Sequence, residues 1–145
     1  MALGITRKAE YAISLLVDLA LHEDGFTLSR QIAQRQRIPS NLLPQIAAIL
    51  GKKGWVHGIR GAGGGLRLAV DPAWITVEDV IQLIEGPIAL NKCLVDEDRC
   101  DKQPECPLHG VWAKAQLRML EVLGGTTIRD LVDAKLALTP KKDPD

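Results

Sequence analysis

The feature that most constrains the fold is an almost pure glycine stretch, Gly61-Ala62-Gly63-Gly64-Gly65, between two short segments that read as strands. Those segments, residues 55–60 and 66–70, predict a β-hairpin with the glycines at its tip. Before the hairpin, apolar residues recur at helical spacing over residues 6–22, 28–36 and 39–53. Three helices followed by a hairpin are typical of a winged helix-turn-helix domain, which we predict for residues 1–72.

The remaining residues predict helices and one long loop. Thr76-Val77-Glu78-Asp79 is a capping signal for a helix that ends near Gly86. Residues 87–106 are polar and show no period, which favours a loop, and residues 73–106 then form a linking helix with its loop. A long helix from Pro107 and a short one through residue 138 follow, before a tail at 139–145. The fold class predicted is mainly α with a small β-hairpin.

The charge distribution indicates what the first half of the chain meets. Residues 1–70 carry nine Lys/Arg and four Asp/Glu, a net of +5, whereas the remainder carries nine and fourteen, a net of −5. A basic half of this kind favours a polyanionic partner. No apolar run reaches the roughly 20 residues that span a bilayer, and the N-terminus lacks the pattern of a secretory signal. We therefore expect a cytoplasmic protein without membrane contact.

All three cysteines lie in the predicted loop, with the spacing Cys93-x6-Cys100-x5-Cys106-x2-His109. An odd number of cysteines without a signal sequence argues against a disulfide framework. Iron–sulfur clusters and zinc both take thiolates, with imidazole as an accepted fourth ligand. The spacing predicts a metal site of Cys93, Cys100, Cys106 and His109; a zinc site without a sensing role and a metal-free thiol redox switch remain alternatives.

The predicted helix-turn-helix offers residues suited to double-stranded DNA. Ser40, Asn41 and Gln45 lie near the start of the third helix, where side chains reach base edges in the major groove. Arg60 and Gly61 are placed to enter a minor groove from the wing. Five basic residues are expected to contact phosphates: Arg30, Arg35, Arg37, Lys52 and Lys53.

Nothing in the sequence predicts catalysis. His22, His57 and His109 lie respectively at a helix end, in a strand and at the exit of the cysteine loop, and none neighbours a serine in a nucleophile elbow. No strand–loop–helix with a Lys-Ser/Thr pair follows the glycine stretch, so a nucleotide-binding loop is not expected either. We predict that the chain is not an enzyme and has no small-molecule substrate.

Four segments resemble the IscR/NsrR/RirA group of winged-helix iron–sulfur regulators: I-T-R-K-A-E-Y-A, R-G-A-G-G-G-L, the three-cysteine loop, and C-P-L-H-G-V-W. The final T-T-I-R-D-L-V extends the likeness to about residue 132. The resemblance implies a homodimer whose long helices, within residues 107–138, cross-pack. It also implies a regulator that senses iron–sulfur status, redox or nitric oxide.

The resemblance offers two candidates for the fourth ligand. The C-P-L-H motif is similar to the IscR branch, which implies that His109 ligates a 2Fe–2S cluster, favoured here over 4Fe–4S. Glu10 stands where the NsrR-like branch has a carboxylate that ligates the cluster from the partner subunit. Pro44 replaces the glutamate with which the IscR branch reads DNA, so the operator is not expected to match that branch.

Overall fold

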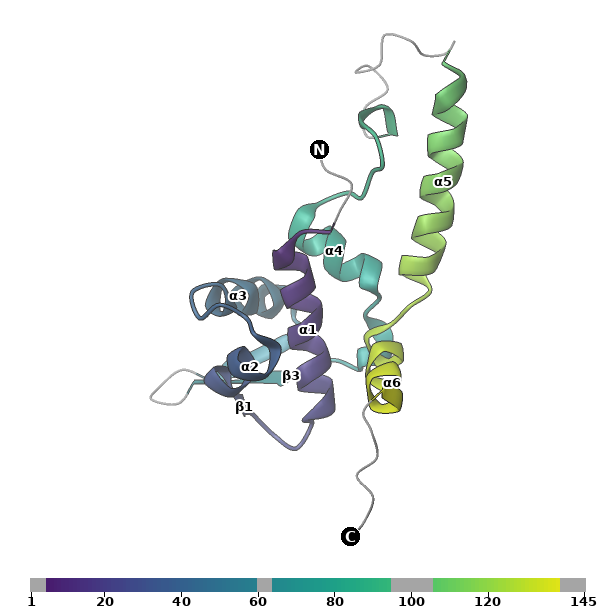
Figure 1. The fold of residues 1–145 in the computed structure, drawn as a ribbon. Helices are drawn as coiled ribbons and strands as arrows, with labels where there is room; N and C mark the ends of the chain where they lie inside the picture. Colours follow the sequence, from purple (N-terminus) through teal and green to yellow (C-terminus); the bar gives the residue numbers. More distant parts are fainter. Residues whose placement is uncertain (1–4, 60–63, 95–105, 139–145) are drawn as a thin grey trace.

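The computed structural model describes residues 5–59, 64–94 and 106–138 and shows a mainly helical chain with one small sheet (Figure 1). This confirms the predicted fold class, whereas the domain boundaries remain predictions. In chain order the described elements are α1 (Arg7–Leu21), β1 (Thr27–Leu28), α2 (Ser29–Gln36), α3 (Leu43–Lys53), β2 (Val56–Ile59), β3 (Gly65–Leu68), the 3₁₀ turn η1 (Pro72–Trp74), α4 (Val77–Glu85), the 3₁₀ turn η2 (Lys92–Leu94), α5 (Pro107–Gly124) and α6 (Ile128–Leu138).

The predicted hairpin is present, and a third strand extends it. Strands β2 and β3 pair antiparallel from Val56 opposite Leu68 to Ile59 opposite Gly65. Strand β1, which the sequence did not predict, pairs with the other edge of β3, so the sheet order is β1-β3-β2. Two residues are too short a stretch for any periodicity to show, and the sequence pattern predicts Leu28 as the first residue of the following helix.

Helix α1 lies at the centre of the fold (Figure 1). It begins after Thr6, whose side chain accepts a hydrogen bond from the Ala9 amide at 3.3 Å. Its buried side chains pack with apolar residues of α2, α3, the sheet, α4 and α6 in a single core. The largest members of that core with almost no solvent exposure are Leu15, Leu16, Leu19, Ile32, Ile46, Leu50, Ile75, Val80 and Ile128. Helix α1 therefore packs against α2, α3, β3, α4 and α6.

The start of α3 differs from the prediction. The helix was expected to open at Pro39-Ser40-Asn41, but it begins at Leu43. The amides of Leu42 and Leu43 both donate to the Pro39 carbonyl, at 2.9 and 3.2 Å, so residues 40–42 form a turn that precedes the helix. Pro44 then occupies the first turn of α3, where a missing amide hydrogen costs nothing.

The C-terminal elements divide into a packed part and a projecting part. Helix α4 begins with a capping box formed by Thr76 and Asp79, as predicted. Helix α6 packs against α1. Helix α5 extends away from the rest of the fold, and none of its residues is buried (Figure 1). Within the described ranges, no helix is long and apolar enough to cross a membrane.

Candidate DNA-binding surface and metal-binding residues

The predicted base-reading residues all lie on the surface at the start of α3. Ser40 and Asn41 are exposed in the preceding turn, and Gln45 is exposed in the first turn of the helix. The Gln45 side-chain amide donates to the Asn41 carbonyl at 3.3 Å, and this contact is exposed. The opposite side of α3 is buried through Leu43, Ile46 and Leu50, so its orientation on the domain is fixed.

Four predicted phosphate contacts, Arg30, Arg37, Lys52 and Lys53, are exposed around this surface. The Lys53 Nζ lies 5.8 Å from the centre of the Trp55 ring, which holds it near the end of α3. Arg60 and Gly61 fall outside the described residues. The wing is nevertheless tied to α2 at its described edge, because the Ser29 amide donates to the Gly64 carbonyl at 3.0 Å.

Arg35, the fifth predicted phosphate contact, is 37% exposed, but its guanidinium is paired with the buried Asp18, a contact that was not predicted from the sequence. Asp18 on α1 is 1% exposed, and Arg35 approaches it with two nitrogens, at 3.0 Å (Nε to Oδ2) and 2.8 Å (Nη2 to Oδ1). Gln36 adds a third donor at 2.9 Å. This network fixes α2 on α1, so the structure gives Arg35 a structural role; a phosphate contact by this residue remains a prediction.

The environment of Asp18 favours its charged form. Burial by itself raises the pKa of this carboxyl, but hydrogen bonds from Arg35 and Gln36 and the charges of Arg35 and His22 outweigh burial, so the pKa lies below its ordinary value. The pKa of Arg35 is raised by the same hydrogen bond. The only sequence signal for this pair was an acid in an otherwise apolar stripe of α1.

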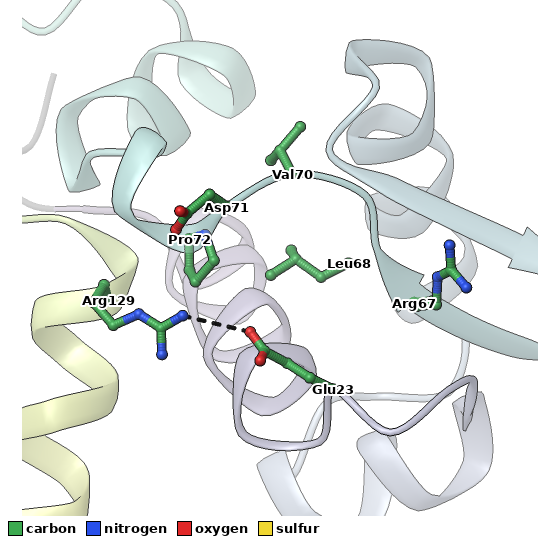
Figure 2. Close-up of a pocket in the computed structure, with 7 residues that line it drawn as sticks. All are labelled: Glu23, Arg67, Leu68, Val70, Asp71, Pro72 and Arg129. Carbon is green, nitrogen blue, oxygen red and sulfur yellow. Dashed lines mark ion pairs between the residues drawn. The ribbon is translucent and has the colours of Figure 1, made fainter.

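Two of the hollows around α1, α2 and α3 differ in their walls. One, of about 420 Å³, separates α2 from the start of α3 and has mainly apolar walls that include Ala33, Ile38, Leu43 and Pro44. The other, of about 460 Å³, lies between α1, α6 and the segment that follows β3 (Figure 2). Across it Arg129 and Glu23 face each other at 3.5 Å, and both are substantially exposed. No predicted site residue lines this second hollow.

The cysteine loop is described at its two ends. Cys93 lies in η2 and is 7% exposed, whereas Cys106 is half-buried and occupies the N-cap of α5. His109 is half-buried in the first turn of α5, and its amide donates to the Cys106 carbonyl at 3.3 Å. Cys100 lies outside the described residues. Among the residues that are described, no three His, Cys, Asp or Glu side chains gather as a metal site.

The donor set still fits a thiophilic metal. A buried thiol, Cys93, precedes the loop, and a second thiol, Cys106, stands at the N-cap of α5; thiols of this kind are ligands for zinc and iron. The preceding segment is joined to α5, because the Leu90 amide donates to Gln116 Oε1 at 2.9 Å. Glu10 is exposed in the first turn of α1.

Comparison with known proteins identifies relatives over nearly the whole chain. Residues 5–134 match the Rrf2 family, described as an iron-dependent transcriptional regulator. NsrR of Bacillus subtilis is 35% identical over 133 residues, covering 90% of this chain and 91% of NsrR. Two solved structures are similar: CymR, the global cysteine regulator of B. subtilis (32% identity, TM-score 0.73, covering 92% and 98%), and T. potens IscR (31% identity, TM-score 0.72, covering 98% and 96%).

Proposed function

Because the chain belongs to the Rrf2 family and is therefore a DNA-binding transcriptional regulator rather than an enzyme, we propose that it acts as a homodimer whose DNA affinity depends on an iron–sulfur cluster. The observation that carries this proposal is the placement of Cys93 and Cys106. These two thiols bracket the segment between the packed body of the protein and the projecting helix α5. A group bound there would fix α5 relative to the DNA-binding elements.

The proposed DNA contacts follow from the surface around α3. The start of α3 enters the major groove, where Ser40, Asn41 and Gln45 meet base edges. The exposed cations Arg30, Arg37, Lys52 and Lys53 neutralise phosphates on either side, which supplies affinity and salt dependence without sequence selectivity. The wing, through Arg60 and Gly61, reaches the adjacent minor groove.

Changing Arg60 to alanine should weaken operator binding while the visible spectrum of the cluster stays the same. Removing one phosphate or minor-groove cation is expected to lower affinity roughly tenfold and to reduce the salt slope by about one. Fluorescence anisotropy at several salt concentrations measures both quantities. Loss of the spectrum together with DNA binding would reject the assignment of Arg60 to the wing contact.

In the proposed dimer, the apolar stripe of α5 packs against the partner subunit. Leu108, Val111, Ala115 and Val122 recur at helical spacing, and all four are exposed in the single chain. An exposed apolar stripe on a projecting helix is the usual form of a helix-pairing surface. The resemblance to the IscR/NsrR/RirA group, which implies a homodimer with cross-packed long helices, supports the same surface.

The proposed cluster would be held by Cys93, Cys100 and Cys106, with His109 or the partner's Glu10 as the fourth ligand. When bound, such a group supplies iron that accepts and releases an electron and that reacts with oxidants or nitric oxide. Imidazole and carboxylate bind more weakly than thiolate and are lost on protonation, so either choice makes the site labile. A 2Fe–2S cluster is favoured over 4Fe–4S.

The chain offers a physical connection from this loop to the DNA-binding elements. Helix α4 packs against both α1 and α5. At the end of α4, Glu85 Oε1 accepts a hydrogen bond at 2.6 Å from the amide of Thr6, which caps α1. Near the other end of α1, Asp18 holds Arg35 of α2. A group bound between Cys93 and Cys106 would therefore act, through α5 and α4, on α1, the helix that supports the helix-turn-helix.

The fourth ligand is identified by comparing His109→Ala with Glu10→Ala. Native mass spectrometry of the anaerobic dimer should give two iron and two sulfide per subunit for a 2Fe–2S cluster. The variant that removes the true ligand is expected to shift the visible bands and to lose cluster several times faster in air, while the other variant behaves like the wild type. Unchanged spectra and lifetimes in both variants would exclude both residues.

The same preparation separates the cluster from its alternatives. An iron–sulfur protein is brown, with sulfide in the mass, whereas a zinc protein is colourless and carries zinc alone. A thiol switch without metal shows only the mass of the polypeptide and loses about 2 Da on forming a disulfide. Either of these last two results would overturn the proposed sensing role and leave the DNA-binding function in place.

A further inference from the structure

The exposed side of α3 combines short apolar side chains with one amide and one cation. Pro44, Ala48 and Lys52 recur every four residues and are exposed, and Gln45 lies beside them. These four residues form the reading face of α3. The buried residues Leu43, Ile46 and Leu50 occupy the other side of the helix, so the reading face points away from the domain. Pro44 and Ala48 were not among the residues expected to read DNA.

We infer that Pro44 and Ala48 select thymine by contact with its C5-methyl group. In the major groove, thymine is distinguished by this methyl group, which short apolar side chains contact, while glutamine pairs bidentately with adenine. Pro44 and Ala48 have no polar side-chain atom, so they cannot read the hydrogen-bonding edges of bases. Their small size also lets the helix backbone approach the bases closely.

The surface around the reading face also favours DNA as the partner. The hollow of about 420 Å³ between α2 and α3 opens beside Pro44, with Ala33, Ile38 and Leu43 in its walls; its other lining residues are polar, namely Ser29, Arg30, Gln34 and Ser40. Apolar surface therefore continues past the helix at the end that enters the groove. Arg30 lines this hollow and Lys52 belongs to the reading face, and both are exposed, which matches a phosphate-flanked partner rather than an apolar protein surface.

The inference rests on the proposed docking of α3 in the major groove and specifies what that docking reads. Gln45, next to Pro44, supplies the adenine contact, and the two apolar residues supply thymine contacts one helical turn apart. The operator half-site should thus contain A·T pairs at neighbouring positions, with thymine methyl groups directed toward α3. Lys52, at the other end of the reading face, contacts a phosphate and therefore adds no preference for any base.

The test replaces thymine with uracil, which removes the methyl group and keeps every hydrogen bond. A duplex is first selected from a random pool by the full-length protein, and each thymine of the half-site is then changed to uracil in turn. At fixed salt, wild-type affinity should fall roughly fourfold for each contacted methyl group. Ala48→Gly and Pro44→Ser should each remove this preference at a different position.

The matched control is Lys52→Gln, which is expected to weaken thymine and uracil duplexes equally. The inference is overturned if wild-type protein binds every uracil duplex within twofold of the parent, a result that needs no variant. It is also overturned if Ala48→Gly and Pro44→Ser both keep the full thymine preference. Failure to select any duplex is a different outcome, because it would contradict DNA binding itself and the inference with it.

Discussion

Replacing Asp18 with asparagine should lower the free energy of unfolding by about 2 to 3 kcal/mol. The carboxylate is 1% exposed and receives three side-chain hydrogen bonds, two from Arg35 and one from Gln36. Asparagine keeps the shape but removes the charge and turns one acceptor into a donor that faces the guanidinium. The loss of unfolding free energy should be smaller than for a fully buried ion pair, because Arg35 is 37% exposed and can turn toward water. Urea unfolding at pH 7 measures it.

The matched control is Glu23→Gln, which removes an exposed ion pair. Glu23 and Arg129 lie 3.5 Å apart with side chains 54% and 40% exposed, so this change should cost less than about 0.5 kcal/mol. The two variants separate a buried, hydrogen-bonded charge from a solvated one in the same domain. Equal losses in both would contradict the structural role assigned to Asp18.

The contribution of Asp18 to the free energy of unfolding should also depend on pH and should decrease in acid. Its pKa is lower in the folded chain than its ordinary value of 3.8, so the stabilisation is complete above that value and is lost as pH falls through the folded pKa. The difference between wild type and Asp18→Asn is therefore expected to persist down to about pH 5 and to shrink below about pH 4. A difference that grows on acidification would contradict this account.

The second large effect is expected at the proposed dimer surface. Val122 is 67% exposed in the single chain and belongs to the apolar stripe of α5. Val122→Lys places a charge in that surface, where it loses hydration and finds no partner, so the dimer dissociation constant should rise at least about 100-fold. Operator affinity should fall with it, because one subunit can occupy only one half-site. Analytical ultracentrifugation over a concentration series measures the dissociation constant.

Leu117→Lys is the control for this surface. Leu117 is 58% exposed on the same helix but does not share the spacing of Leu108, Val111, Ala115 and Val122. This variant should remain dimeric and bind the operator as the wild type does. A monomeric Leu117→Lys together with a dimeric Val122→Lys would move the interface to another side of α5.

The parts of the fold that the sequence predicted have strong local signals. The glycine tip predicted the hairpin, Thr76 and Asp79 predicted the start of α4, and helical spacing predicted the long helix after Pro107. Each signal is contained in a few consecutive residues. The parts that were missed depend on distant partners: β1 exists because Thr27 and Leu28 pair with β3, and no pattern in two residues reveals this.

The candidate site likewise has parts that local sequence signals predicted and parts that depend on distant residues. Exposure of Ser40, Asn41 and Gln45 followed from the position of the turn and helix, although the helix begins later than expected. Arg35 was grouped with the phosphate contacts because the sequence shows its charge but not its distance from Asp18, which is 17 residues away. The choice between His109 and the partner's Glu10 depends on a second subunit, so neither the sequence nor the single chain decides it.

The central claim, that cluster state controls DNA affinity, is tested most directly by operator binding with matched loaded and metal-free protein. The dimer is purified anaerobically, divided, and one half is stripped of iron; both halves are then titrated against the same selected duplex at one salt concentration. Affinity for this duplex is expected to differ at least about tenfold between the two halves, a free-energy difference of about 1.4 kcal/mol. Indistinguishable affinities across the selected duplexes, with both halves still dimeric, would contradict it.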